Sequence, residues 1–283
     1  MTLWQARDRE QETGRSATAP MTLALRYAAR SDVGLLRKGN EDSGYAGPHL
    51  LAVADGVGGN VAGEVASAAA IAAIAPLDAE YPGPDLGRVL ADAVATANQR
   101  LQELISSDPS VEGMGTTLTA LLWSEGCAAL CHIGDSRAYL LRDGQFIQVT
   151  HDHTLVQLLI DEGRITAVDV ARHPYRSLLL RALDGRPAAE ADLTLLETCA
   201  GDRYLLCSDG LSGVVSEQTL HQVLASVRDL DEVTSRLVEL AVEGGGPDNI
   251  TCIVADVIDA RSTQVQPTRP PVLVGAAADG ASS

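Results

Sequence analysis

The stretch AYLLRDGQFIQV, residues 138–149, reads as two short strands joined by a tight turn. Asp143 and Gly144 at its centre are residue types that adopt the positive φ angles of a two-residue hairpin turn. Residues 116–123 and 127–133 are a second pair of apolar runs, broken by Ser-Glu-Gly, and they predict another hairpin. Because hairpins pair their strands antiparallel, we expect antiparallel sheets.

The predicted helices come in pairs and do not alternate with every strand. From Leu86 to Ile105, apolar residues recur at the three-four spacing of an amphipathic helix. This pattern favours an α+β fold over a doubly wound parallel sheet. We expect two stacked antiparallel β-sheets flanked by helix pairs, an α-β-β-α sandwich. The remaining helices are expected at 62–76, 216–226 and 230–243, and the remaining strands at 24–31, 49–54, 203–208 and 250–257.

The two ends of the chain differ in composition from its middle. Residues 1–21 are polar and predict a flexible leader. Residues 259–283 are rich in Pro, Ser, Ala and Gly, which predicts a disordered tail. The folded domain is therefore expected over residues 22–258.

Charge and composition exclude several classes of function. The chain has 283 residues, a net charge of -17 and only 3% aromatic residues. Such an acidic surface repels nucleic acids and anionic membranes, and few aromatic rings are present for base stacking. No apolar run reaches the ~20 residues of a membrane span. We expect a cytoplasmic protein with reduced cysteines and no nucleic-acid or membrane partner.

Four aspartates share an unusual context. Asp55, Asp135, Asp209 and Asp248 each lie at or beside the end of a predicted strand, next to small residues. Each alone is explained as a turn residue. If these strand ends converge, however, the carboxylates would repel and desolvate one another, and a divalent cation is the natural compensation. Oxygen ligands of this kind suit Mg²⁺ or Mn²⁺.

Seven motifs carry a family resemblance that spans roughly residues 24–257. Their order resembles that of the metal-dependent protein serine/threonine phosphatases of the PPM, or protein phosphatase 2C, type, in particular the compact bacterial members. That resemblance implies the same sandwich fold. The motifs are SDVGLLRKGNEDS (31–43), VADGVGG (53–59), GMGTTLTAL (113–121), HIGDSRAYLLRDG (132–144), LLIDEGRIT (158–166), LLCSDGLS (205–212) and GGPDNITCIV (245–254).

The resemblance implies roles for the residues that match the family motifs. Asp55 matches the aspartate that bridges two metal ions, and the Gly56 carbonyl matches a ligand of one of them. Asp209 and Asp248 match further ligands of this dinuclear centre. Arg37 matches the arginine that binds the substrate phosphate.

Other matches concern the surroundings of that centre. Asp42 matches an acid that acts near the metals, partly through water, and Glu41 lies beside it. Asp135 matches an acid that shares a third, weaker metal with Asp209. Ser177 is expected near that third site, and Asn249 is expected to support the turn that carries Asp248.

Two further features follow from the resemblance. Residues 160–182 match a mobile flap beside the cleft. Val57 stands where many eukaryotic members have a histidine proposed as the general acid, so the leaving group must be protonated by another group.

The resemblance implies hydrolysis of phosphoserine and phosphothreonine in proteins by a metal-activated water. Mn²⁺ or Mg²⁺ would be the cofactor, with two ions in the core site and a third more weakly held. Phosphorylated proteins, namely bacterial Ser/Thr kinases and their targets, would be the partners of a monomeric enzyme. Two alternatives stay open: a non-catalytic phosphatase-like binding module, and a hydrolase of a small phosphorylated metabolite. A cysteine nucleophile is disfavoured, because the residues between Cys131 and Arg137 lie on a loop between strands.

Overall fold

A computed structural model describes residues 22–58, 62–81, 85–124, 126–170, 172–187, 189–261 and 269–281. The predicted leader, residues 1–21, lies outside these ranges. The strands are β1 Leu23–Asp32, β2 Asp42–Ala46, β3 Leu50–Val57, β4 Gly115–Thr116, β5 Leu118–Ser124, β6 Cys127–Ile133, β7 Arg137–Arg142, β8 Gln145–Gln148, β9 Asp192–Glu197, β10 Arg203–Cys207, β11 Ile250–Asp259 and β12 Val272–Gly275. The α-helices are α1 Gly63–Ile74, α2 Leu86–Ser107, α3 Leu155–Asp161, α4 Ala167–Val170, α5 Asp209–Ser212, α6 Glu217–Ser226, α7 Leu230–Glu243 and α8 Ala276–Ala281.

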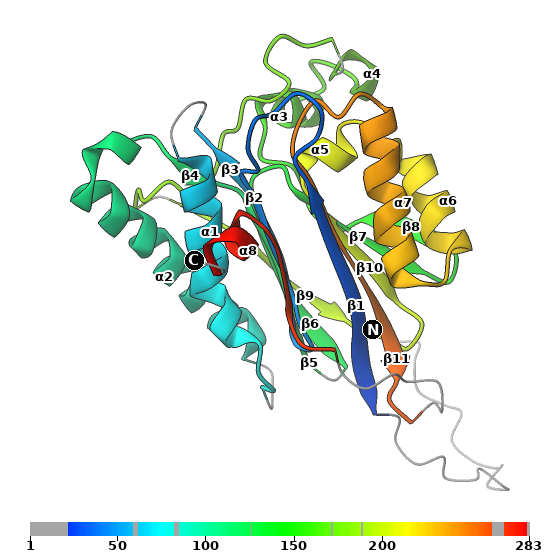
Figure 1. Ribbon diagram of the computed structural model, residues 1–283. Coiled ribbons are helices and arrows are strands. Elements are labelled where there is room, and N and C mark those ends of the chain that lie inside the picture. The colour runs from blue at the N-terminus through cyan, green and yellow to red at the C-terminus, as the bar shows by residue number, and fades with distance from the viewer. Residues whose placement is uncertain are drawn as a thin grey trace, which may run out of the picture.

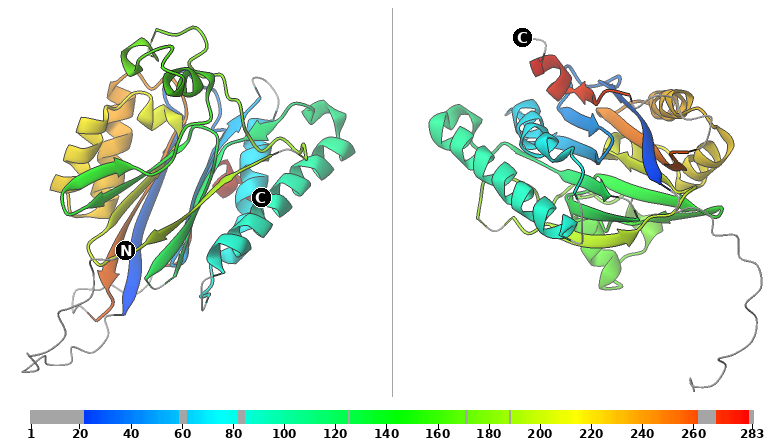
Figure 2. Two further views of the ribbon diagram at one scale, coloured as in Figure 1. Left: turned by 180° about the vertical axis from the view of Figure 1, so that it is seen from behind. Right: turned by 90° about the horizontal axis from the view of Figure 1, so that it is seen from below.

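Two antiparallel sheets stack face to face and carry helices on their outer sides (Figure 1). One sheet has the strand order β1-β11-β10-β7-β8. The other has the order β12-β2-β3-β5-β6-β9, with the short β4 paired to β3. Helices α1 and α2 cover the second sheet, while α6 and α7 cover the first, as both views in Figure 2 also show. The predicted α-β-β-α sandwich is confirmed.

The hairpin at residues 137–148 has the predicted turn. Asp143 and Gly144 have φ angles of 50° and 77°. Arg142 and Gln145 are directly paired across the turn. Both central residues therefore have the left-handed backbone that matches the twist of the flanking strands.

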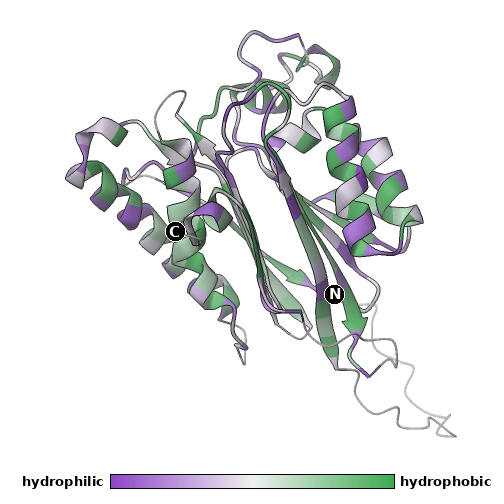
Figure 3. Cartoon of the chain, viewed as in Figure 1, coloured by the Kyte–Doolittle hydropathy of each residue, from purple (hydrophilic) through white to green (hydrophobic). Residues whose placement is uncertain are grey.

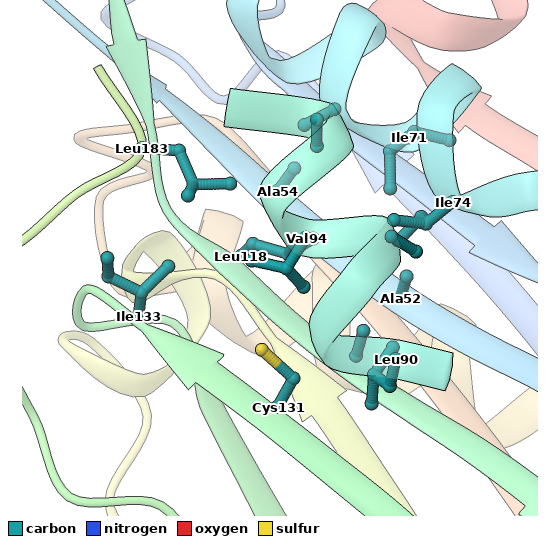
Figure 4. Close-up of a cluster of buried hydrophobic side chains, with 14 of the residues drawn as sticks. Ala52, Ala54, Ile71, Ile74, Leu90, Val94, Leu118, Cys131, Ile133 and Leu183 are labelled. Atoms are coloured by element: carbon teal, nitrogen blue, oxygen red, sulfur yellow. The ribbon is translucent and has the colours of Figure 1, made fainter. Parts of the chain in front are cut away.

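Successive side chains along each strand point to opposite faces of its sheet, which divides the apolar interior into three layers. In β3, Leu50, Ala52 and Ala54 pack toward α1 and α2, while Leu51 and Val53 pack between the two sheets. Figure 4 shows the outer layer, in which Leu90 and Val94 of α2 lie with Ile71 and Ile74 of α1 over the sheet. A third apolar layer lies between the other sheet and helices α6 and α7.

Hydropathy follows this layering. The strands between the helix pairs are mostly apolar, whereas the helices carry polar residues among apolar ones (Figure 3). Among the described residues, no helix combines the length and the apolar character that crossing a bilayer requires.

The structure corrects the predicted disordered tail for residues 269–281. Residues 272–275 form β12, which pairs antiparallel with β2, and residues 276–281 form α8. The apolar run Val272–Val274 is too short to stand out in a segment rich in Pro and Ala. Sequence reasoning also missed β2 and β9, because β2 (DSGYA) has no β-branched residue and β9 is largely exposed.

Replacement of Leu90 by Ala tests the packing of the helix pair on its sheet. Leu90 is fully buried between α2 and the sheet. We expect Leu90→Ala to lower the free energy of unfolding by about 2–5 kcal/mol, because it removes apolar contacts and leaves a cavity. Urea unfolding measures this. Val65→Ala, at a partly exposed position on α1, is the control and should cost under about 1 kcal/mol. Equal effects of the two substitutions would contradict this packing.

Candidate active site

Strand ends from both sheets bring acidic residues together. Asp42 begins β2 and lies directly opposite Asp55 of β3. Asp209 begins α5 just after β10, and Asp248 lies two residues before β11. Asp135 lies in the loop that connects β6 to β7, and therefore connects the two sheets. The strand and helix ends that carry these residues lie at the end of the sandwich where α5 begins (Figure 1).

Asp42 is a buried acid that links the two sheets. Asp42 is only 1% exposed to solvent. The Ser208 hydroxyl donates a hydrogen bond to its Oδ2 atom at 2.7 Å. Its other oxygen, Oδ1, is buried without a hydrogen-bond partner. Burial raises the pKa of Asp42 to about 7, against the hydroxyl contacts that lower it. A buried oxygen without a partner is costly unless another group satisfies it.

Asp55 is fixed by its backbone. Its N–H donates to the Thr117 hydroxyl at 3.0 Å, and its carbonyl oxygen accepts from the Thr117 N–H at 2.8 Å and from the Thr116 hydroxyl at 3.0 Å. Burial, and then the neighbouring charges of Asp42 and Asp209, raise the pKa of Asp55 well above its ordinary value. The consecutive threonines of the GMGTTLTAL motif therefore hold an acid whose charge is opposed by its surroundings.

Asp209 and Asp135 extend the same cluster. Burial, followed by the charge of Asp248, raises the pKa of Asp209, although a hydrogen bond with the Asp55 side chain acts in the opposite direction. Burial and the charge of Asp209 raise the pKa of Asp135 to about 8. The Arg137 charge lowers both pKa values only in part, since its guanidinium binds both carboxylate oxygens of Asp152.

Arg37 and Asp248 form an ion pair at the open side of the cluster. The Arg37 Nη2 atom lies 2.7 Å from Asp248 Oδ2, and both side chains are partly exposed. Asn249 holds the loop that carries Arg37: its side-chain amide donates to the carbonyls of Val33 and Gly39, both at 2.9 Å. Its Oδ1 accepts from the Glu41 N–H at 2.8 Å. The Asn249 side chain therefore fixes the loop, and its backbone N–H donates to Asp248 Oδ1 at 2.8 Å.

Glycines permit close backbone approach at this site. A Cβ atom on Gly56 would collide with the backbone of Gly63, and one on Gly210 would collide with the carbonyl of Asn249. The Gly56 N–H donates to the Glu41 carbonyl at 3.1 Å. Only glycine at these two positions lets the acid-bearing segments pack this closely.

The donor set fits hard divalent cations. It combines several carboxylates that oppose one another's charge with a buried Asp42 oxygen that has no partner. Within the described ranges, no three Asp, Glu, His or Cys side chains are already arranged as a closed metal cage. A donor set that suits cations and the lack of a preformed cage are compatible, because the Asp248 carboxylate contacts Arg37 and Asp42 Oδ2 accepts from Ser208. A cation held by Asp248 would require this carboxylate to exchange its Arg37 partner, whereas Asp42 Oδ1 is already without one.

Several expected residues lie elsewhere or outside the described ranges. Ser177 is exposed in the segment after α4 and, among the described residues, makes no side-chain hydrogen bond to the acids. Val57 pairs with Gly115 at the end of β3. Gly59 is outside the described residues. The expected flap, residues 160–182, contains α4, which lies at the same end of the sandwich as the acids (Figure 1).

Sequence reasoning missed the residues that support the acids. Ser208, Thr116 and Thr117 are buried hydroxyl residues that hold Asp42 and Asp55. The sequence does hint at these residues, since Ser208 directly precedes Asp209 and the two threonines interrupt an apolar run. Sequence alone could not indicate which acid each hydroxyl contacts.

The sequence of this chain is similar to those of known phosphatases. Residues 40–242 match the family model for protein phosphatase 2C. The serine/threonine protein phosphatase PstP of Mycobacterium tuberculosis is 54% identical over 258 residues, which are 91% of this chain. This chain spans about half the length, 49%, of that relative. The serine/threonine phosphatase stp of Listeria innocua is 34% identical over 236 residues, which are 80% of this chain and 94% of the relative.

Solved structures resemble the same region. The crystal structure of M. tuberculosis PstP/Ppp superposes with a TM-score of 0.80 at 54% identity, over 83% of this chain and 99% of that one. The PstP catalytic domain in complex with two manganese ions gives a TM-score of 0.79 at 54% identity, over 84% of this chain and 100% of that one.

The buried charge of Asp42 predicts a pH dependence of stability without metal. Because its folded-state pKa is raised to about 7 from 3.8, the folded chain binds more protons than the unfolded chain between these values. The contribution of Asp42 protonation to the free energy of unfolding is therefore fully present below about pH 4 and is lost as the pH rises to 7. In EDTA at pH 8, we expect Asp42→Asn to raise the free energy of unfolding by up to about 4 kcal/mol, with no gain near pH 4.

Urea unfolding at the two pH values measures this difference. Asp92→Asn, at an exposed position on α2, is the matched control and should change neither value. A loss of stability in Asp42→Asn at pH 8 in EDTA would show that the Asp42 charge is compensated within the protein.

Proposed function

This chain belongs to the protein phosphatase 2C family, and we propose that it hydrolyses phosphoserine and phosphothreonine in proteins with the help of divalent cations. The observation that carries the proposal is the convergence of Asp42, Asp55 and Asp209 from both sheets, with an oxygen of Asp42 left without a partner. Such a cluster is stable at neutral pH when cations neutralise it.

The assigned ligands divide into a core and a periphery. Asp55, the Gly56 carbonyl, Asp209 and Asp248 would hold two Mn²⁺ or Mg²⁺ ions. When bound, such ions lower the pKa of water and so supply a nucleophile at neutral pH. Asp42, held by Ser208, completes the core from the buried side.

The periphery comprises Asp135, Glu41, Ser177 and the segment 160–182. Asp135, together with Asp209, is proposed to hold a third ion, which the raised pKa values of both acids favour. Glu41 would act beside the core, because its backbone is fixed by Asn249. Ser177 stays a proposal that no contact to the acids supports. Residues 160–182 are proposed as a mobile flap.

Arg37 is proposed to bind the substrate phosphate. Its guanidinium offers a planar fork to two phosphate oxygens, and its partner Asp248 is one of the proposed metal ligands. Cation binding by Asp248 would release Arg37 for the phosphate. Cation binding by Asp248 and phosphate binding by Arg37 would therefore favour each other, because each requires the Arg37–Asp248 ion pair to open.

The biological setting is also a proposal. We propose a monomeric cytoplasmic enzyme that acts on Ser/Thr kinases and their targets; the names of its relatives support the serine/threonine phosphatase activity alone. The alternatives are a non-catalytic binding module and a hydrolase of small phosphorylated metabolites. Comparing hydrolysis of a phosphothreonine peptide, a phosphorylated metabolite panel and p-nitrophenyl phosphate, with Mn²⁺ or EDTA, separates them. Activity on the peptide that requires Mn²⁺ is the expected result.

Asp209→Asn tests the metal-ligand assignment. The amide keeps the size of the side chain but removes the charge that attracts a cation, so we expect kcat to fall by at least ~100-fold with the fold retained. Steady-state kinetics with Mn²⁺ and circular dichroism measure the two effects. Asp92→Asn is the control for removal of a surface charge. Dephosphorylation at the normal rate by Asp209→Asn would overturn the assignment.

Substitution of Arg37 tests the phosphate contact. Arg37→Ala removes the guanidinium and should raise KM for a phosphothreonine peptide by about 10-fold or more, with a smaller change in kcat. Arg37→Lys keeps a positive charge but loses the planar fork, so its KM should lie between those of Arg37→Ala and the wild type. An unchanged KM in Arg37→Ala would remove Arg37 from the phosphate site.

A further inference from the structure

Strand β2 is covered on the side away from β3 by the C-terminal segment. Every residue of β2 is buried, although strands at the edge of a sheet are ordinarily exposed or protected by charge. The covering strand is β12, in which Val274 lies opposite Gly44. A Cβ on Gly44 would lie 2.8 Å from a Val274 methyl group, so the missing side chain of Gly44 makes the space that Val274 fills.

The end of this covering segment contacts the acid-bearing end of β2. Gly275, with a φ angle of 69°, packs so closely on the Asp42 carbonyl that any Cβ would collide with it. The Ala277 N–H then donates to the Ser43 hydroxyl at 3.1 Å. Ser43 in turn shares a 2.9 Å hydrogen bond with Ser67 of α1. The segment therefore touches Asp42 itself and its neighbour in the chain.

The beginning of the segment is anchored on the opposite layer. The Arg269 guanidinium contacts both carboxylate oxygens of Asp231, on α7, at 2.9 and 2.7 Å. The Tyr27 hydroxyl donates to the Arg269 carbonyl at 2.6 Å. Farther along, Val272 packs against the core between the sheets, and Ala277 packs against the core under α1. Residues 269–281 thus join both layers, and β12 lies beside β2 with α8 next to α1 (Figure 1).

We propose that residues 269–281 form a positioning strap, whose docking on β2 holds Asp42 in place for divalent cations. This inference rests on the proposed function, because that function assigns Asp42 to the cation site. Gly275 packs on the Asp42 backbone and Ala277 binds the Ser43 hydroxyl from one side, while Ser208 holds the Asp42 carboxylate from the other. Binding linkage then requires that cations strengthen the docking of the strap by the same factor by which the strap strengthens cation binding.

Gly275→Ala tests the strap against a matched substitution in the same segment. The new methyl group would collide with the Asp42 carbonyl in a backbone conformation that alanine disfavours. Gly280→Ala adds the same methyl group where nothing lies within 4 Å. Isothermal titration with Mn²⁺, without substrate, should give a Kd about 10-fold weaker for Gly275→Ala and unchanged for Gly280→Ala. Equal Mn²⁺ affinity of folded Gly275→Ala and the wild type would overturn the strap.

Hydrogen exchange of the unaltered protein gives a second test that does not depend on folding of a variant. Saturating Mn²⁺ should slow amide exchange of residues 272–275 by about 10-fold. It should slow exchange less in β8, the far edge strand of the other sheet. Equal slowing in both strands, or none in residues 272–275, would contradict the proposal.

Failure of the strap proposal can be distinguished from failure of the proposed function. A protein that binds Mn²⁺ and protects residues 272–275, yet hydrolyses no phosphopeptide, would overturn the proposed function and leave the strap standing. A protein that is active with Mn²⁺, and whose Gly275→Ala variant binds Mn²⁺ normally, would overturn the strap alone.

Discussion

Mutual repulsion among carboxylates is the constraint on which the rest of this structure depends. Asp42 and Asp55 face each other across two buried strands, and Asp209 approaches them from the opposite sheet. Bringing such groups together out of water is strongly unfavourable unless a cation neutralises them. A fold that nevertheless keeps them together must hold each acid firmly by groups that have no charge of their own.

Neutral groups perform this task throughout the site. The Ser208 hydroxyl ties Asp42 to the other sheet, and Thr117 fixes the backbone of Asp55. Asn249 uses its amide to join the loop of Arg37 to the turn of Asp248. The acids therefore stand on a rigid framework, while the ion pair at the open side, Arg37 with Asp248, is the part that a ligand can exchange.

Patterns with a short period were readable from the sequence, whereas contacts between distant segments were not. The Asp143-Gly144 turn and the three-four spacing of α2 correctly predicted a sandwich of antiparallel sheets and helix pairs. The context of the strand-end aspartates indicated that they would meet. The sequence did not predict the pairing of β12 with β2, because this pairing depends on how Val274 fits against Gly44 and not on the composition of the segment. Likewise, no local pattern connects Ser208 with Asp42, which lies 166 positions away.

Anomalous diffraction from crystals grown with Mn²⁺ tests the central claim most directly. The account predicts two strong anomalous peaks among Asp42, Asp55, Asp209 and Asp248, with the Arg37–Asp248 ion pair opened. Crystals in which manganese is found only at other places, with that ion pair intact, would contradict the claim that these acids are assembled to hold cations.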